Sequence, residues 1–221
     1  APKFEDSMKE LMDRWADFDR PLFHGGKESS FTIEIAANWK LAVENYCESY
    51  HLPWVHPGLN SYSKLEDHYH IEYKNKFSGQ GTKVYQQLKD KDGNVFPDFS
   101  NLEAKWDTAA EYIAVYPNVL LGVHRDHAFA IILIPDSPEK TYEHIHLFYS
   151  QEDTPEHLRL KNSKQWRLVF DEDVPVVEGM QKGRHAVNFD GGRFSPVMDN
   201  PTHCFHYWVA NEVQNGRMRK S

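Results

Sequence analysis

Cysteine, long apolar runs and clusters of positive charge are all scarce in this sequence. Its two cysteines, Cys47 and Cys204, are too few for a cysteine-rich zinc site or a disulfide framework, so we expect a reducing, cytoplasmic location. The longest apolar stretch, 128–135, is far below the roughly 20 residues that a membrane helix needs. The net charge is −8 and the longest basic run is 217–220, which argues against nucleic acid or an anionic membrane as a partner.

The chain has the size and composition of one globular domain. It has 221 residues, of which 40% are hydrophobic and 26% charged, so we expect a single domain over 1–221 with a sizeable core. The first residues, APKFEDSMKE, are polar and acidic, unlike a signal peptide. They include no initiator Met, which is typical of a domain from a longer chain or of processing. Thirteen histidines in an acidic chain are unusual and direct attention to metal chemistry.

Hydrophobic periodicity predicts helices at both ends of the chain and strands between them. Apolar residues recur at helical spacing in 4–18, 40–52 and 154–183, the last interrupted at Pro175, and in a short segment around 205–213. Strand patterns cover 31–35, 69–73, 82–88, 112–116, 129–134 and 142–149, with turns at 79–81 and 92–93. No βαβ alternation is visible. The pattern therefore predicts an α+β fold with an antiparallel sheet.

The segment 38–57 holds two imidazoles, two carboxylates and four aromatic rings. Glu48 and His51 are three residues apart and would share a helix face. His51 and His56 are five apart, which places them about 140° apart on an unbroken helix, too far for one small ion. Pro53 disfavours an unbroken helix. We therefore predict a break at Pro53 that brings His56 back toward His51.

Two imidazoles need a third ligand to hold Fe(II). Two histidines and one carboxylate on one face of an octahedron leave positions open for O2 and substrate. The best candidates lie in Asp171-Glu172-Asp173, close to Pro175, where a perturbed helix often marks a functional site. Physical reasoning on the residues alone leaves open which of the three carboxylates binds.

Two motifs resemble those of a known family. The run N-W-K-x3-E-N-x2-E-x-Y-H-x4-H-P at 38–57 resembles the iron-site segment of Rieske oxygenase α subunits, and E-D-x4-E-x2-Q-x-G at 172–183 resembles the segment that supplies their carboxylate ligand. The resemblance extends to 116–118 and 189–196, so it covers most of the chain. It implies a START-like helix-grip fold, a curved antiparallel sheet around a long helix.

The resemblance also implies an activity and a set of residue roles. His51, His56 and Asp173 match the ligands of a mononuclear Fe(II), and Glu48 matches the acidic residue that bridges this iron to a Rieske cluster on the neighbouring subunit. Electrons would come from a reductase or ferredoxin, and the full-length protein would be a homotrimer. The implied reaction is O2-dependent hydroxylation of a small molecule. Glu at position 48 is more typical of the branch that acts on quaternary ammonium compounds. An aromatic acid is the other substrate class that the resemblance allows.

One departure from the family is large. A Rieske [2Fe-2S] cluster needs two Cys and two His ligands. Cys47 lies inside the iron segment, and Cys204, which Phe205 and His206 follow, has no second pair to complete such a site. We therefore expect the Rieske cluster outside this sequence.

Other interpretations of the same residues remain. The two histidines could serve a zinc-dependent hydrolase, and a helix-grip fold could be a non-enzymatic ligand-binding module. The pairs His124/His127 and His144/His146 lack an evident third ligand, so we expect packing or surface roles. His203 and His206 could pack on an aromatic helix or line a substrate pocket. Six aromatic residues could either pack in the core or cage a cation: Trp54, Trp106, Tyr116, Phe194, Tyr207 and Trp208.

Overall fold

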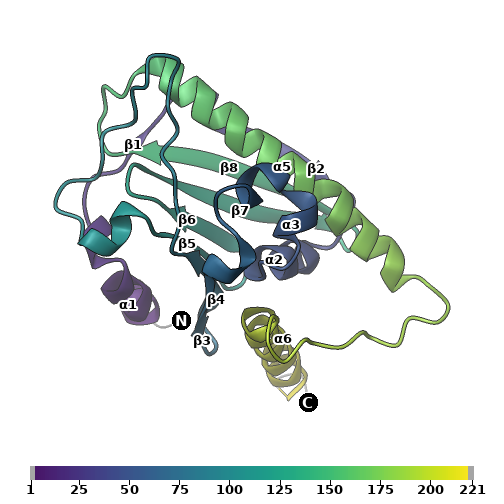
Figure 1. The fold of residues 1–221 in the computed structure, drawn as a ribbon. Helices are drawn as coiled ribbons and strands as arrows, with labels where there is room; N and C mark the ends of the chain where they lie inside the picture. Colours follow the sequence, from purple (N-terminus) through teal and green to yellow (C-terminus); the bar gives the residue numbers. More distant parts are fainter. Residues whose placement is uncertain (1–2, 219–221) are drawn as a thin grey trace.

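The computed structural model describes residues 3–218, which form one antiparallel sheet with helices against it (Figure 1). The strands follow the order β1-β8-β7-β6-β5-β4-β3, and β2 pairs with β8 beside β1. The strand bounds are β1 Phe23–His24, β2 Ser30–Ile35, β3 His68–Tyr73, β4 Phe77–Thr82, β5 Ala110–Val115, β6 Val119–Val123, β7 His127–Ser137 and β8 Lys140–Tyr149.

Six α-helices and four short 3-10 helices are described. The α-helices are α1 Phe4–Arg14, α2 Trp39–Cys47, α3 Leu52–Val55, α4 Pro57–Asn60, α5 Glu156–Arg184 and α6 Asn200–Met218. The 3-10 helices are η1 Ala16–Phe18, η2 Lys27–Ser29, η3 Leu65–Asp67 and η4 Ala104–Asp107. None of the helices within 3–218 combines the length and hydrophobicity that crossing a membrane requires.

The long helix α5 crosses the sheet, and α2 lies beside it (Figure 1). Alternate residues of β8, among them Ile145 and Leu147, are fully buried beneath these helices, as expected for a strand with one face on a core. From α5, Trp166 and Phe170 pack in the same cluster. The α+β prediction, with an antiparallel sheet against a long helix, is confirmed.

A second hydrophobic cluster anchors α1. Leu11, Trp15 and Phe18 pack with Phe77 and Trp106. Arg14, Trp15 and Tyr69 all donate hydrogen bonds to the buried Glu111 carboxylate. A buried carboxylate needs such partners, because an unpaired charge in the interior is costly.

The structure corrects the predicted strand at 82–88 and the turn at 79–81. The strand is β4, 77–82, and it contains Gly79 and Gly81. A Cβ at Gly79 would lie 2.0 Å from the backbone oxygen of Tyr112, and one at Gly81 would lie 2.3 Å from the Tyr69 ring. These glycines therefore allow neighbouring groups to approach the strand closely, which is a recognised reason for Gly inside a strand.

Three further features differ from the sequence prediction. Helix α5 continues through Pro175, so its pattern is not interrupted there. Helix α6 has 19 residues and is not short. Strand β6 was not predicted; it contains Gly122, which lies against the ring of Phe129.

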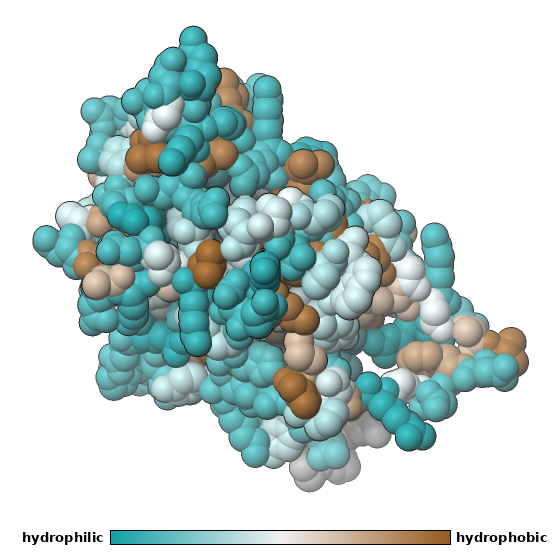
Figure 2. Space-filling view, viewed as in Figure 1, coloured by the Kyte–Doolittle hydropathy of each residue, from teal (hydrophilic) through white to brown (hydrophobic). Residues whose placement is uncertain are grey.

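The loop between α5 and α6 projects from the body (Figure 1). Figure 2 shows that this face is largely hydrophilic, with hydrophobic atoms at the tip of the projecting loop. Val187 is fully exposed and Val197 is 70% exposed.

Candidate metal centre

The two histidines of the first motif are placed by a break in the backbone after α2. Helix α2 ends at Cys47, Glu48 is extended, and His51 is the N-cap of α3. The predicted helix to residue 52 with a break at Pro53 is therefore wrong. Pro53 lies in the first turn of α3, where its missing N–H costs no helical hydrogen bond. His56 lies between α3 and α4, so one short turn separates the two imidazoles.

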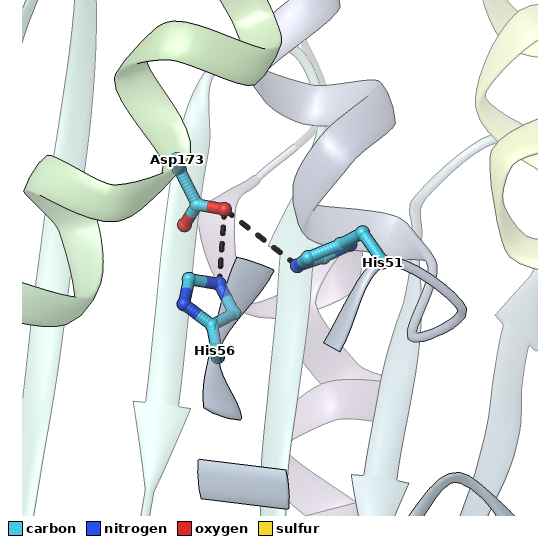
Figure 3. Close-up of side chains that lie close together, drawn as sticks. All are labelled: His51, His56 and Asp173. Atoms are coloured by element: carbon cyan, nitrogen blue, oxygen red, sulfur yellow. Dashed lines mark hydrogen bonds and ion pairs between the residues drawn. The ribbon is translucent and has the colours of Figure 1, made fainter. Parts of the chain in front are cut away.

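Figure 3 shows His51, His56 and Asp173 pointing toward one another, the carboxylate coming from α5. Asp173 Oδ1 lies 3.0 Å from Nε2 of His56 and 3.6 Å from Nε2 of His51. Two ligands bound at about 2.1 Å and at right angles to each other lie about 3 Å apart. The donor set, two imidazole nitrogens and one carboxylate oxygen, therefore fits one small divalent ion.

Each histidine has its other ring nitrogen held by a carboxylate. Glu48 Oε1 lies 2.5 Å from Nδ1 of His51, and Glu48 Oε2 accepts from the His51 backbone N–H. Glu172 Oε2 lies 2.8 Å from Nδ1 of His56. A carboxylate at Nδ1 holds the proton there and leaves Nε2 free to bind a metal, which is a common support for metal-bound histidine.

Asp173 is the one member of the three adjacent acids that faces both imidazoles. Its Oδ1 also accepts a hydrogen bond from Nδ2 of Asn45, 2.9 Å away. Asp171 pairs with Arg167 on the exposed side of α5. Glu172 and Asn45 are site residues that the sequence reasoning did not assign. The signal for Glu172 was present, since it directly precedes Asp173 on the same helix.

Burial and charge act in opposite directions on His56. Burial lowers the pKa of His56, but hydrogen bonds and charge from Asp173 and Glu172 outweigh it, so the pKa is raised. The same contacts make this centre attractive to any cation, because the imidazole is held among carboxylates.

The carboxylate of Glu143 is buried in β8 on the helix-covered face of the sheet. Burial, followed by the charge of nearby Asp173, raises the pKa of Glu143 to about 8. The group is therefore largely protonated at neutral pH, as expected for a carboxyl that burial deprives of solvent.

A cavity of about 80 Å³ opens at the three residues. It is lined by both imidazoles, Asp173, and the rings of Tyr46, Tyr62, Tyr85, Tyr112, Phe129, Trp166 and Phe170. None of the six aromatic residues suggested as a cation cage lines it, and Trp54 is 79% exposed. The aromatic wall instead comes from α2, β5, β7, α5 and two loop residues, Tyr62 and Tyr85.

Within residues 3–218, no second group of three possible ligands lies within metal-binding distance. His124 and His127 are buried and stacked, with centroids 4.2 Å apart. His144 and His146 lie on the opposite side of β8 and contact hydroxyls of β2. The packing and surface roles expected for these pairs agree with this placement.

The last two histidines lie on α6. His206 is paired with Glu44 on α2, and both His203 and His206 pack edge-on against Phe194. Neither lines the cavity.

Comparison with known proteins identifies the family. The model of the ring hydroxylating alpha subunit (catalytic domain) matches residues 25–215. The chain belongs to this family. The predicted relationship to Rieske oxygenases is therefore confirmed, and so is the helix-grip fold, through the solved structures described next.

Curated relatives align with most of this chain. Putrescine 2-hydroxylase of Bordetella bronchiseptica is 26% identical over 93% of the chain and 51% of its own length. The chloroplastic choline monooxygenase of Arabidopsis thaliana is 28% identical over 84% of the chain and 43% of its own length. The chain thus spans about half the length of the curated relatives it matches.

Two solved oxygenase structures share the fold. A quaternary ammonium Rieske monooxygenase in complex with L-carnitine has a TM-score of 0.70 and 22% identity, covering 96% of this chain and 55% of that one. Naphthalene 1,2-dioxygenase from Rhodococcus has a TM-score of 0.64 and 14% identity, covering 96% and 62%. The same fold therefore serves oxygenases with very different substrates.

Proposed function

We propose that this chain is the catalytic domain of a Rieske oxygenase, in which His51, His56 and Asp173 hold one Fe(II). The observation that carries the proposal is the convergence of two Nε2 atoms on one carboxylate, each Nδ1 being tied to a further carboxylate. Two histidines and one carboxylate are typical of O2-activating iron sites with open positions. The proposed reaction is O2-dependent hydroxylation of a small molecule.

The residues around the centre have separable roles. Asp173 supplies negative charge, and Asn45 fixes the direction of its Oδ1. Glu48 and Glu172 hold the protons on Nδ1 of the two histidines. Bound iron, supplied with electrons from a [2Fe-2S] cluster, would provide the O2 chemistry. The protein contributes ring orientation and a cavity next to the centre.

Glu48 has a second proposed role, as the bridge to the cluster of a neighbouring subunit. Its side chain is 7% exposed and contacts His51 through both oxygens. Tyr50 and Trp54, on either side of His51 in sequence, are exposed hydrophobic residues. We propose that the cluster lies outside 1–221, with a reductase or ferredoxin as donor, in a homotrimer in the cytoplasm.

The cavity favours a small organic cation over an aromatic acid. No Lys or Arg among the described residues lines it, so a substrate carboxylate would find no positive side chain there. Its volume of about 80 Å³ holds several water-sized groups, which suits a compact substrate. Two similar proteins are named for putrescine and choline. We propose a substrate of this kind, such as an N-methylated or quaternary ammonium compound.

Metal analysis tests the centre. Dialysis of the chain against Fe(II) under argon should give one iron per chain, and His51→Ala, His56→Ala and Asp173→Ala should each lose it. His144→Ala, on the other side of β8, is the matched control and should keep it. Full iron occupancy in Asp173→Ala would move the third ligand elsewhere.

Activity separates the rival functions. Residues 1–221 alone should show no sustained O2 uptake with NADH and a reductase, whereas the chain joined to a Rieske domain should consume O2 with substrate. Zinc-dependent hydrolysis without O2 uptake would indicate the hydrolase, and ligand binding with no metal affinity would indicate the binding module.

A further inference from the structure

Three side chains of the cavity wall turn their polar atoms toward a buried cluster behind them. The wall residues are Tyr85, Tyr112 and Trp166. Behind them lie His124, Asp126 and His127, all at most 2% exposed. The contacts are Tyr85 to Asp126 at 2.9 Å, Tyr112 to His124 at 3.1 Å and Trp166 to His127 at 2.8 Å.

The contact between Trp166 and His127 fixes the protonation of His127. An indole N–H can only donate, so Nε2 of His127 must accept and carries no proton. The single proton of this neutral ring is then on Nδ1, which donates to Asp126 Oδ1 at 2.7 Å. His127 therefore satisfies the carboxylate without neutralising it.

Within residues 3–218, no Lys or Arg forms an ion pair with Asp126. The hydroxyl of Tyr85 donates to it, and burial followed by the charge of Asp126 holds the pKa of Tyr85 well above its ordinary value. Burial is the main cause that lowers the pKa of His124 well below its ordinary value, so that ring is neutral too. The Arg125 guanidinium binds Asp98 and lies close to Asp107, and Asp126 is the weakest of the three carboxylate charges that it interacts with.

A negative charge therefore lies behind an aromatic wall. Ring faces attract cations through their quadrupole, more strongly where water is excluded. A fully buried carboxylate adds to this, because the effective dielectric constant of the interior is well below that of water. At the other end of the cavity, the two charges of a bound divalent ion would face three carboxylates: Glu48, Glu172 and Asp173.

We propose that Asp126 sets the charge preference of the cavity, so that it takes a compact organic cation against the rings of Tyr85, Tyr112 and Trp166. This inference rests on the proposed function, which makes this cavity the substrate site. Asp126 acts through the wall residues and is a specificity-determining residue, not a catalytic one. The same charge rejects carboxylate substrates.

A matched pair of ligands separates the effect of the ligand's charge from the effect of its shape. Choline and its uncharged carbon isostere, 3,3-dimethylbutan-1-ol, have the same shape, so their affinity ratio reports the electrostatic preference. Calorimetry on the chain under argon, with and without Fe(II), measures both ligands without turnover. Unit charges on the order of 7 Å apart at an effective dielectric constant of about 20 predict a preference for choline of about 10- to 50-fold.

Asp126→Asn tests the residue. It should reduce the choline-to-isostere ratio by about 10-fold or more while leaving isostere binding within about twofold. Asp13→Asn makes the same change in net charge on an exposed part of α1 and should leave the ratio unchanged. An unchanged affinity ratio in Asp126→Asn overturns the proposal. A wild-type chain that binds choline and its isostere equally also overturns it, and this measurement does not depend on whether the variant folds.

The outcomes separate this inference from the proposed function. A choline preference that depends on Asp126, in a chain that consumes no O2 even when joined to a Rieske domain and supplied with substrate, supports the inference and contradicts the oxygenase. Substrate-dependent O2 uptake by that protein, together with a choline preference that is unchanged in Asp126→Asn, supports the oxygenase and contradicts the inference.

Discussion

Glu172 Oε2 lies 2.8 Å from Nδ1 of His56. The adjacent residue, Asp173, contacts the other nitrogen of the same ring. Consecutive residues on a helix point about 100° apart, so these two carboxylates reach opposite sides of one imidazole. The pair of acids in the second motif thus divides into one candidate ligand and one residue that orients a ligand.

The first prediction separates these acids. Glu172→Gln should weaken Fe(II) binding by about 10- to 100-fold, because His56 loses the carboxylate that orients its ring. Asp171→Asn removes the same charge one residue earlier, on a side chain paired with Arg167, and should leave the affinity nearly unchanged. Equilibrium dialysis under argon measures both. Equal losses of Fe(II) affinity in the two variants would mean that Glu172 acts only through its charge and not by orienting His56.

The second prediction concerns Glu48 in the protein assembled with a Rieske domain. Glu48→Gln should keep iron and allow reduction of the cluster, but slow re-oxidation of that cluster by O2 and substrate. Stopped-flow absorbance follows the cluster directly. Glu44→Gln, on α2 four residues before Glu48, is the matched control, because its carboxylate binds Arg184 and His206 instead. A wild-type rate in Glu48→Gln would end the bridging hypothesis.

The third prediction concerns pH. The pKa of Glu143 is raised to about 8 in the folded chain, from an ordinary value of 4.5. Between these values the folded state holds a proton that the unfolded state has lost, so stability falls as pH rises, by up to about 1.4 kcal/mol per unit. This contribution is fully present below pH 4.5 and is lost as pH rises through 8.

Glu143→Gln removes that dependence. The metal-free variant should have a flatter stability profile between pH 5 and 8 and should exceed the wild type at pH 8. Urea unfolding at several pH values measures this. Parallel profiles for the two proteins would mean that Glu143 does not carry the raised pKa.

The fourth prediction tests the corrected position of β4. Gly79→Ala places a methyl group 2.0 Å from the backbone oxygen of Tyr112, so the strands must separate and stability should fall by about 2 kcal/mol or more. Gly179→Ala, on α5 with nothing within 4 Å, should raise stability by up to about 1 kcal/mol. The midpoints of urea unfolding measure the change in stability of each variant. A neutral Gly79→Ala would place this glycine in a turn, as the sequence pattern suggested.

Local pattern identified most of the secondary structure and failed where long-range packing decides. The periodicity of 142–149 predicted a strand, and β8 covers it, because alternation reports which face is buried. Gly79 and Gly81 looked like a turn because glycine is common in turns, whereas here strand neighbours exclude any side chain. Pro53 looked like a helix end, whereas it lies in the first turn of α3.

The sequence by itself determined the family and the candidate ligands, because the motifs at 38–57 and 172–183 combine residue types whose metal chemistry is local to each side chain. The motif register already pointed to Asp173, but only the tertiary structure brings its Oδ1 to both imidazoles and places Glu172 where it orients His56. Helix α5 is over a hundred residues from α3, and its rotation is set by packing on the sheet. It also placed Asp126 behind Tyr85, a contact across 41 residues that no sequence period encodes.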